Sequence, residues 1–197
     1  QTLDVQRFGH ASPSSVQSLH SEDELTHYTW LVAGCVGEFW TELCGRHLPG
    51  YSLLPQEEMM RMGRQYGMGL QRLNIIRDAG ADLAAGRCYW PVEILAQAGL
   101  TPDMLAQAAR TPHTDTQHAL APLYTQWLDH TQTQLADGMR YALALKPLRL
   151  RHRIEQRCSF GIGLAVMLGG TVLHLERGNH PARCLIEFAV ARNLETV

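Results

Sequence analysis

The chain has 197 residues, of which 45% are hydrophobic and 18% are charged, and its formal net charge is -2. This length and composition favour a single folded domain over residues 1–197 and exclude a disordered chain. The near-neutral charge gives no basis for general nucleic-acid binding, so no nucleic-acid partner is expected. Five scattered cysteines form no CxxC pair and no zinc spacing, which indicates reduced thiols in a cytoplasmic protein.

The first long helix is predicted after a polar lead-in loop over residues 1–20. Ser21, with Glu24 three residues later, fits a capping box, and the helix should run to about residue 44 or 45. Gly34 and Gly37 are poor helix formers, which indicates close approach of a neighbouring helix or ligand. Apolar residues recur at helical spacing and predict a buried stripe: Tyr28, Leu31, Val32, Cys35, Val36, Phe39 and Leu43.

A second long helix is predicted over residues 55–85, because Pro55 suits a first helical position and Gly86 suits a helix end. One face of this helix carries two amides and two carboxylates within an arc of about 80°: Gln71, Asn74, Asp78 and Asp82. Such oxygen ligands suit Mg²⁺. Spacing alone favours a solvated face, because an Asp pair four residues apart costs only about 0.2–0.5 kcal/mol.

The second half of the sequence also predicts helices. Thr101-Pro102-Asp103 starts a short helix, residues 111–118 form a polar connector, and a helix follows over residues 119–145. Further helical runs are expected over residues 148–175 and 181–193. The apolar stretch 158–175 is interpreted as a buried helix rather than a membrane span, since its glycines suit tight packing. Because no alternating strand pattern stands out, the fold class is all-α.

A basic run follows the helix at residue 145 and has two interpretations: Lys146, Arg149, Arg151, Arg153 and Arg157. These cations either form a solvated helix start or contact an anion, such as a diphosphate or the lipids of a membrane surface. The second interpretation leaves open a peripheral association with the inner face of a membrane. The sequence does not determine the oligomeric state.

Two segments carry a family resemblance. The pattern LQxxNIIRDxxxDxxxGRxYWP, from Leu70 to Pro91, closely resembles the second aspartate-rich motif of the squalene/phytoene synthase family. The segment from Tyr28 to Gly37 resembles the family's YxxxVAGxVG helix. The resemblance implies the all-α isoprenoid synthase fold, with helices around a central apolar cavity. Because no first aspartate-rich motif is found, the chain is expected to be a C-terminal portion of that domain, with its N-terminal part missing.

The resemblance also implies roles for individual residues. Asn74, Asp78 and Asp82 would ligate Mg²⁺ bound to a substrate diphosphate. Gln71, Arg77 and Arg87 would help to hold that diphosphate, and Arg77 would also stabilise it as it departs. Tyr28 would be the catalytic tyrosine beside the carbocation, and Val32 and Gly34 would contact the substrate. One departure is Ala81, where the family often has an acidic residue.

The implied activity is a Mg²⁺-dependent prenyltransferase that joins two farnesyl diphosphates head to head into presqualene diphosphate and, with NADPH, squalene. The Tyr-Trp-Pro at Tyr89–Pro91 resembles squalene synthases more than phytoene synthases. A phytoene or dehydrosqualene synthase remains an alternative. A non-catalytic family member acting as a binding or assembly protein is another, and a head-to-tail prenyltransferase or terpene cyclase is a third. The presence of Tyr28, Asp78 and Asp82 favours an enzyme over the non-catalytic family member.

Overall fold

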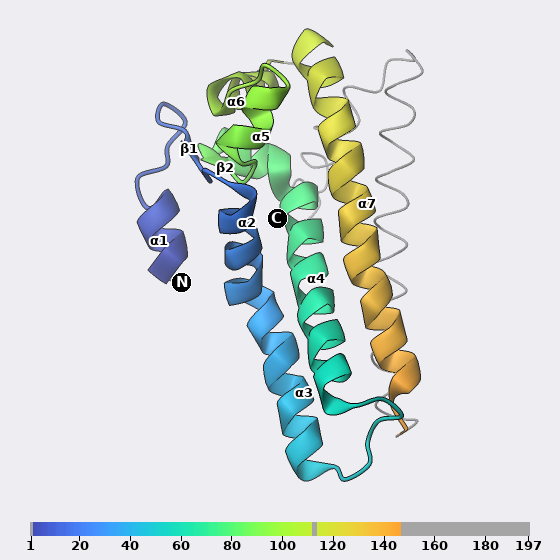
Figure 1. Ribbon diagram of the computed structural model, residues 1–197. Helices are drawn as coiled ribbons and strands as arrows, with labels where there is room; N and C mark the ends of the chain where they lie inside the picture. The colour runs from blue at the N-terminus through green and yellow to red at the C-terminus, as the bar shows by residue number, and fades with distance from the viewer. Residues whose placement is uncertain (1, 112–113, 147–197) are drawn as a thin grey trace, which may run out of the picture. The chain divides into compact units, whose positions relative to one another are not determined.

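The computed structural model describes residues 2–111 and 114–146, which form two compact units. The described part of unit 1 contains residues 2–28, 74–111 and 114–127, and that of unit 2 contains residues 29–73 and 128–146. Helices dominate both units, and the strands among the described residues are two residues long (Figure 1). The predicted all-α class is therefore confirmed.

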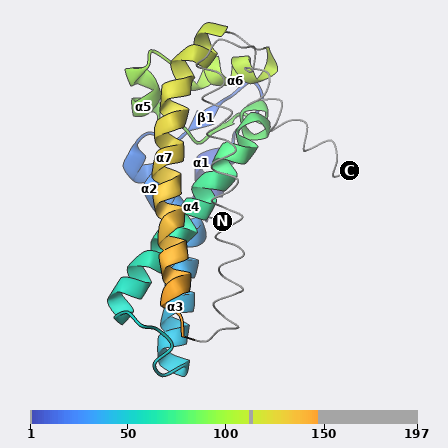
Figure 2. The ribbon, with the colours of Figure 1, turned by 90° about the vertical axis from the view of Figure 1, so that its right-hand side faces the viewer.

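The described part of unit 2 contains three helical segments, which lie side by side in Figure 1 and are seen after a turn of 90° in Figure 2. The π-helical turn η1 (Trp30–Gly34) leads into α3 (Cys35–His47). The other two segments are the first part of α4 (Gln56–Ala84) and the last part of α7 (Thr114–Ala144). A core cluster joins α4 and α7 and consists of Tyr51, Met59, Met62, Tyr141, Ala144 and Leu145.

Small residues, rather than large apolar ones, form the contact between α3 and α4. A Cβ atom on Gly37 would lie 2.0 Å from the carbonyl oxygen of Gly63, so the two backbones touch there. One turn further along, Thr41 is fully buried, and its hydroxyl lies 2.7 Å from the Gly37 carbonyl oxygen and 3.1 Å from the Tyr141 hydroxyl. This backbone contact is what glycine allows and any side chain would prevent.

The predicted buried stripe on the first long helix is therefore wrong for most of its members. Leu31 and Val32 are 40% and 42% exposed, and Val36 and Phe39 are 46% and 59% exposed. Tyr28 is buried as predicted. The physical reason is that α3 turns its glycine and threonine face toward α4, because only small residues permit so close an approach. Hydrophobic periodicity does not register such a face.

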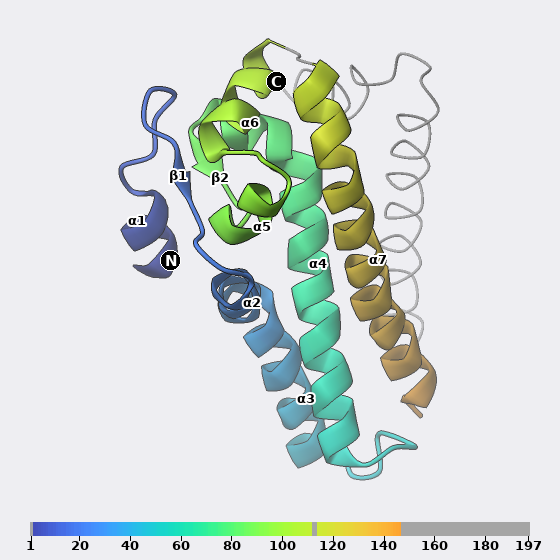
Figure 3. The same ribbon diagram turned by 45° about the horizontal axis from the view of Figure 1, so that its top comes forward.

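Besides the second part of α4 and the first part of α7, the described part of unit 1 contains several short elements. In chain order they are α1 (Thr2–Phe8), β1 (Gln17–Ser18), α2 (Glu22–Thr29), β2 (Arg87–Cys88), α5 (Val92–Gln97) and α6 (Pro102–Arg110). Strands β1 and β2 are parallel, with Gln17 opposite Arg87 and Ser18 opposite Cys88 (Figure 3). The predicted lead-in loop is thus wrong in part, since it contains α1 and β1, and α5 was not predicted.

Several predicted helix boundaries are confirmed in unit 1. Gly86 follows α4 with a φ of 81°, a conformation that favours glycine. Any Cβ there would also lie 2.1 Å from the Ser12 carbonyl oxygen. The Thr101 side chain caps α6 by accepting a hydrogen bond from the Met104 amide. The polar connector over residues 111–118 is wrong in part, because α7 begins at Thr114 and continues through Pro122.

The predicted helices over residues 148–175 and 181–193, and the arginines of the basic run, lie outside the described residues. Across residues 2–111 and 114–146, none of the helices has the length and apolar character needed to cross a membrane.

Candidate active site

Two tyrosines meet in unit 1 at the end of α2. Tyr28 is 5% exposed, and its hydroxyl donates a hydrogen bond to the Tyr89 hydroxyl at 3.3 Å. The two ring centroids lie 5.3 Å apart at an angle of 45°. Phe8 of α1 packs on the other ring, with its centroid 4.8 Å from that of Tyr89. Residues from α1, from α2 and from the segment after β2 therefore meet around the phenol of the predicted catalytic tyrosine.

The segment that carries Tyr89 is anchored on both sides. The Ser18 hydroxyl donates to the Trp90 carbonyl oxygen at 2.7 Å, beside the β1–β2 pair. The Trp90 ring stacks on Trp127, with centroids 3.8 Å apart and planes 14° apart. Tyr124 meets Trp90 edge-on at 5.1 Å. Aromatic packing and strand pairing together hold residues 87–91 in one conformation.

The polar face of α4 continues into unit 1 through Asn74, Asp78 and Asp82, all half-buried. Arg87, just after the helix, donates from Nε at 3.0 Å and from Nη2 at 2.7 Å to one oxygen of Asp82. The Asp82 side chain is 15% exposed, whereas that of Arg87 is 43% exposed. The arginine therefore reaches from solvent onto a largely sheltered carboxylate.

Arg77 and Asp78 form a second pair on the same helix. Arg77 donates from Nε at 2.8 Å and from Nη2 at 2.6 Å, one bond to each oxygen of Asp78. This bidentate hydrogen bonding raises the pKa of Arg77 above its usual value. Both side chains are 44% exposed, so the pair lies open to solvent. Two arginine–aspartate pairs one helical turn apart thus mark this face of α4.

The chemistry of these donors fits Mg²⁺ bound to a diphosphate. Asn74, Asp78 and Asp82 supply oxygen atoms on successive turns, with a rise of about 6 Å between neighbours. Within the part of the chain that the structure describes, no three His, Cys, Asp or Glu side chains gather around a common point. An open set of one or two carboxylates, completed by phosphate oxygens and water, is how proteins usually hold Mg²⁺.

The remaining predicted site residues lie in unit 2. Gln71 is half-buried on α4, and Val32 is 42% exposed on η1. Gly34 is buried, and a Cβ there would lie 2.9 Å from the Met68 side chain. Of the two uses predicted for this glycine, close approach of a neighbouring helix is the one that the structure shows. Its contact with a substrate stays a prediction.

Sequence reasoning assigned no site role to Tyr89 or Phe8. The signal for Tyr89 was present, since it lies within the quoted motif two residues after Arg87. Nothing in the local sequence pattern pairs it with Tyr28, because the two residues are 61 positions apart. Phe8 gave no signal at all, as it lies in a segment predicted to be a loop.

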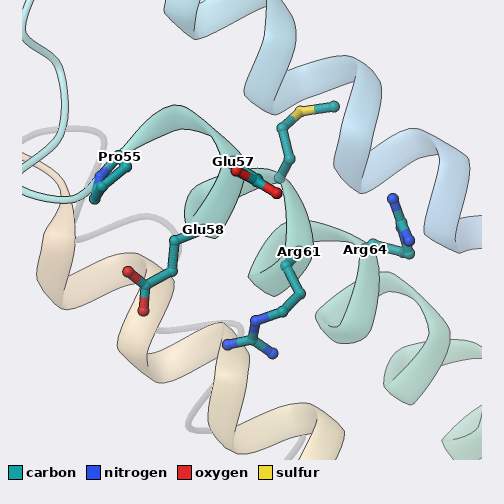
Figure 4. A pocket seen from close by; sticks show the side chains of 6 residues that line it. Pro55, Glu57, Glu58, Arg61 and Arg64 are labelled. Atoms are coloured by element: carbon teal, nitrogen blue, oxygen red, sulfur yellow. The ribbon is translucent and has the colours of Figure 1, made fainter.

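A separate open pocket of about 540 Å³ lies at the start of α4 in unit 2 (Figure 4). Its lining residues are Pro55, Glu57, Glu58, Met60, Arg61 and Arg64. Arg61 donates to Asp137 at 2.7 Å, and Arg64 donates to Glu38. None of the residues predicted to bind the metal ion or the substrate lines this pocket, so it is not part of the candidate site.

The fold and the α4 face define an all-helical protein with paired aspartates and arginines suited to a diphosphate group. A family model described as squalene/phytoene synthase matches residues 4–180, and the chain belongs to this family. The fold resembles that of squalene synthase HpnC from Alicyclobacillus acidocaldarius, with a TM-score of 0.63 and 22% identity. That match covers 79% of this chain and 54% of HpnC, and it confirms the predicted isoprenoid synthase fold.

Curated relatives include both kinds of synthase. A bifunctional lycopene cyclase/phytoene synthase from Podospora anserina is 34% identical over 111 residues, covering 55% of this chain and 18% of the relative. Squalene synthase ERG9 from Saccharomyces cerevisiae is 38% identical over 85 residues, covering 43% and 18%. Phytoene synthase 2 from Zea mays is 39% identical over 79 residues, covering 40% and 19%. The chain thus matches less than a fifth of the length of each of these relatives.

Proposed function

We propose that this protein catalyses the head-to-head condensation of two prenyl diphosphates. Membership of the squalene/phytoene synthase family supports the reaction class. The observation that carries the proposal is the α4 face, where Arg77 holds Asp78 and Arg87 holds Asp82. A diphosphate with its bound metal ion can replace both partners in such a pair. Its anionic oxygens can bind the arginine, and its metal ion can bind the aspartate.

Asn74, Asp78 and Asp82 would hold Mg²⁺, which when bound neutralises the charge that develops on the departing diphosphate. Arg77 and Arg87 would turn their planar guanidinium groups to the phosphate oxygens, a geometry that arginine matches in bidentate fashion. Their present partners keep both side chains at the site before substrate arrives. This electrostatic stabilisation of the leaving group is the main contribution expected from these residues.

Tyr28 would lie beside the allylic carbocation left by diphosphate departure. Its burial at 5% exposure excludes bulk water from the phenol, and water would quench such a cation. The aromatic ring offers a negative face to a cation, and the phenol oxygen offers lone pairs. We therefore assign Tyr28 to stabilising the cation, and Val32 and Gly34 to contacting the substrate.

For the product, we propose presqualene diphosphate from two farnesyl diphosphates and, with NADPH, squalene. The Tyr-Trp-Pro sequence at Tyr89–Pro91 supports this choice by its resemblance to squalene synthases. Phytoene synthesis from two geranylgeranyl diphosphates is the second candidate. The phytoene synthase relatives from Podospora anserina and Zea mays favour it.

The test is to incubate the protein with Mg²⁺ and labelled farnesyl or geranylgeranyl diphosphate, with and without NADPH, and to extract the lipids. Squalene that appears only with NADPH supports the first candidate, and presqualene diphosphate alone assigns the reduction to another protein. Phytoene from geranylgeranyl diphosphate supports the second candidate. Absence of turnover with both substrates would contradict an enzymatic role and favour a binding or assembly function.

A further inference from the structure

We propose that Tyr89 is a positioning residue that orients the phenol of Tyr28 for the head-to-head reaction; this inference rests on the proposed function. The evidence is the hydroxyl–hydroxyl hydrogen bond of 3.3 Å between the two side chains. Tyr28 is the donor in this bond. A phenol has a single proton, so a Tyr28 hydroxyl that gives its proton to Tyr89 turns its lone pairs elsewhere.

The direction of this bond determines what Tyr28 can do. With its proton directed at Tyr89, the phenol presents electron density to the reacting carbons, which suits stabilisation of a carbocation. Without this bond to Tyr89, the hydroxyl could instead give its proton to a phosphate oxygen. Tyr89 therefore selects one of two chemical uses of Tyr28 without touching the substrate itself.

Tyr89 is placed to perform this function because its own position is fixed. Phe8 packs on its ring at 4.8 Å, and the next residue, Trp90, stacks on Trp127. On the other side of Tyr89, Cys88 is fully buried and paired in β2 with Ser18. A group held on both sides in this way can orient a partner, since its side chain loses little further entropy on forming the bond.

The experiment is a double-mutant cycle with Tyr28→Phe, Tyr89→Phe and the variant carrying both substitutions. Phenylalanine keeps the ring packing and removes only the hydroxyl. Tyr89→Phe should lower kcat about three- to tenfold, the effect of one neutral hydrogen bond, and leave KM for the prenyl diphosphate unchanged. In the Tyr28→Phe background the second substitution should have no further effect on kcat, because Tyr89 acts only through Tyr28.

Tyr141→Phe is the matched control. It also removes a buried hydroxyl-to-hydroxyl contact, in this case the 3.1 Å contact with Thr41 in unit 2. It should lower the melting temperature without a kcat effect that depends on Tyr28. In a protein labelled with ¹³C at the tyrosine Cζ atoms, the Tyr28 signal should shift in Tyr89→Phe and stay in place in Tyr141→Phe.

Two results would overturn the inference while leaving the proposed function intact. One is an unchanged kcat in Tyr89→Phe, and the other is a loss of the same factor in both backgrounds, which would mean that Tyr89 acts independently of Tyr28. Wild-type protein without turnover on any prenyl diphosphate would instead overturn the proposed function, and with it the role of Tyr89. The two failures are thus distinguished by the wild-type measurement.

Discussion

Gly37 of α3 and Gly63 of α4 meet backbone to backbone, since a Cβ on Gly37 would lie 2.0 Å from the Gly63 carbonyl oxygen. A Cβ on Gly63 would in turn lie 2.7 Å from the Thr41 hydroxyl. The contact buries Thr41 completely and brings its hydroxyl to Tyr141. The packing of unit 2 therefore depends on glycine at positions 37 and 63 as well as on its apolar core.

Gly37→Ala should destabilise the protein by about 1–3 kcal/mol, because the added methyl group meets rigid backbone and the helices must move apart. Urea unfolding measures this change. The comparison is Gly45→Ala on the same helix, where the new Cβ would meet the side-chain amide of Gln56 rather than backbone. That amide can turn aside by giving up its hydrogen bonds to Tyr51 and Thr41, so Gly45→Ala should destabilise the protein by less than Gly37→Ala does. Equal effects at both positions would contradict the backbone contact.

Asp82→Asn should raise the Mg²⁺ concentration needed for half-maximal turnover by about tenfold or more. The substitution keeps the shape of the side chain and removes the charge that binds Arg87 and, as proposed, the cation. The measurement is a Mg²⁺ titration of initial rates. Asp129→Asn, at an exposed position on α7, is the control and should leave the Mg²⁺ dependence unchanged. A wild-type Mg²⁺ dependence in Asp82→Asn would remove Asp82 from the metal site.

Arg87→Lys should raise KM for the prenyl diphosphate about tenfold, because lysine keeps the charge and loses the planar fork. Stability should change by less than about 1 kcal/mol, since the Arg87 side chain is 43% exposed and solvent screens its ion pair. Arg46→Lys, at an exposed ion pair with Glu42, is the control and should leave KM unchanged. The role proposed for Arg87 would be wrong if both lysine variants kept the wild-type KM.

Cys88 should make the protein sensitive to alkaline pH. Burial raises the pKa of this thiol from 9.0 to about 11. The folded state thus holds the thiol proton more tightly than the unfolded state does. The resulting stability is fully present below pH 9 and is lost as the pH rises toward 11, by at most about 1.4 kcal/mol per pH unit.

Urea unfolding at pH 8 and pH 10.5 tests the effect of Cys88. Cys88→Ser and Cys88→Ala remove the titrating group, so each variant should lose less stability over this interval than the wild type does. The stability at pH 8 is compared with the stability at pH 10.5 within each protein, so the destabilisation caused by the substitution itself cancels. If the wild type and both variants lost the same stability, the thiol would not be the group responsible.

The long elements could be predicted from sequence because their signals are local. Pro55 and Gly86 mark the limits of α4. The four-residue spacing of Asn74, Asp78 and Asp82 places their side chains on one face of this helix. The family resemblance rests on the same continuous segments. Local signals were therefore sufficient for the fold class and for placing these side chains on one face, whereas the binding of a diphosphate there stays a prediction.

Contacts between distant segments could not be predicted in this way. The pairing of β1 with β2 involves strands of two residues, which are too short to show any alternation. The exposed positions of Val36 and Phe39 follow from the glycine contact between α3 and α4, which hydrophobicity does not encode. The bond between Tyr28 and Tyr89 is likewise visible only once the chain is folded.

The β1–β2 pairing has a consequence for where the polypeptide can be shortened. Ser18 reaches the Trp90 carbonyl oxygen across 72 positions, and Leu19 accepts from the Val92 amide at 2.9 Å. A fragment that began at Ser21 would leave the carbonyl of Trp90 and the amide of Val92 without these partners. A fragment that keeps these backbone contacts therefore starts at or before Gln17, and one that also keeps Phe8 packed on Tyr89 starts before Phe8.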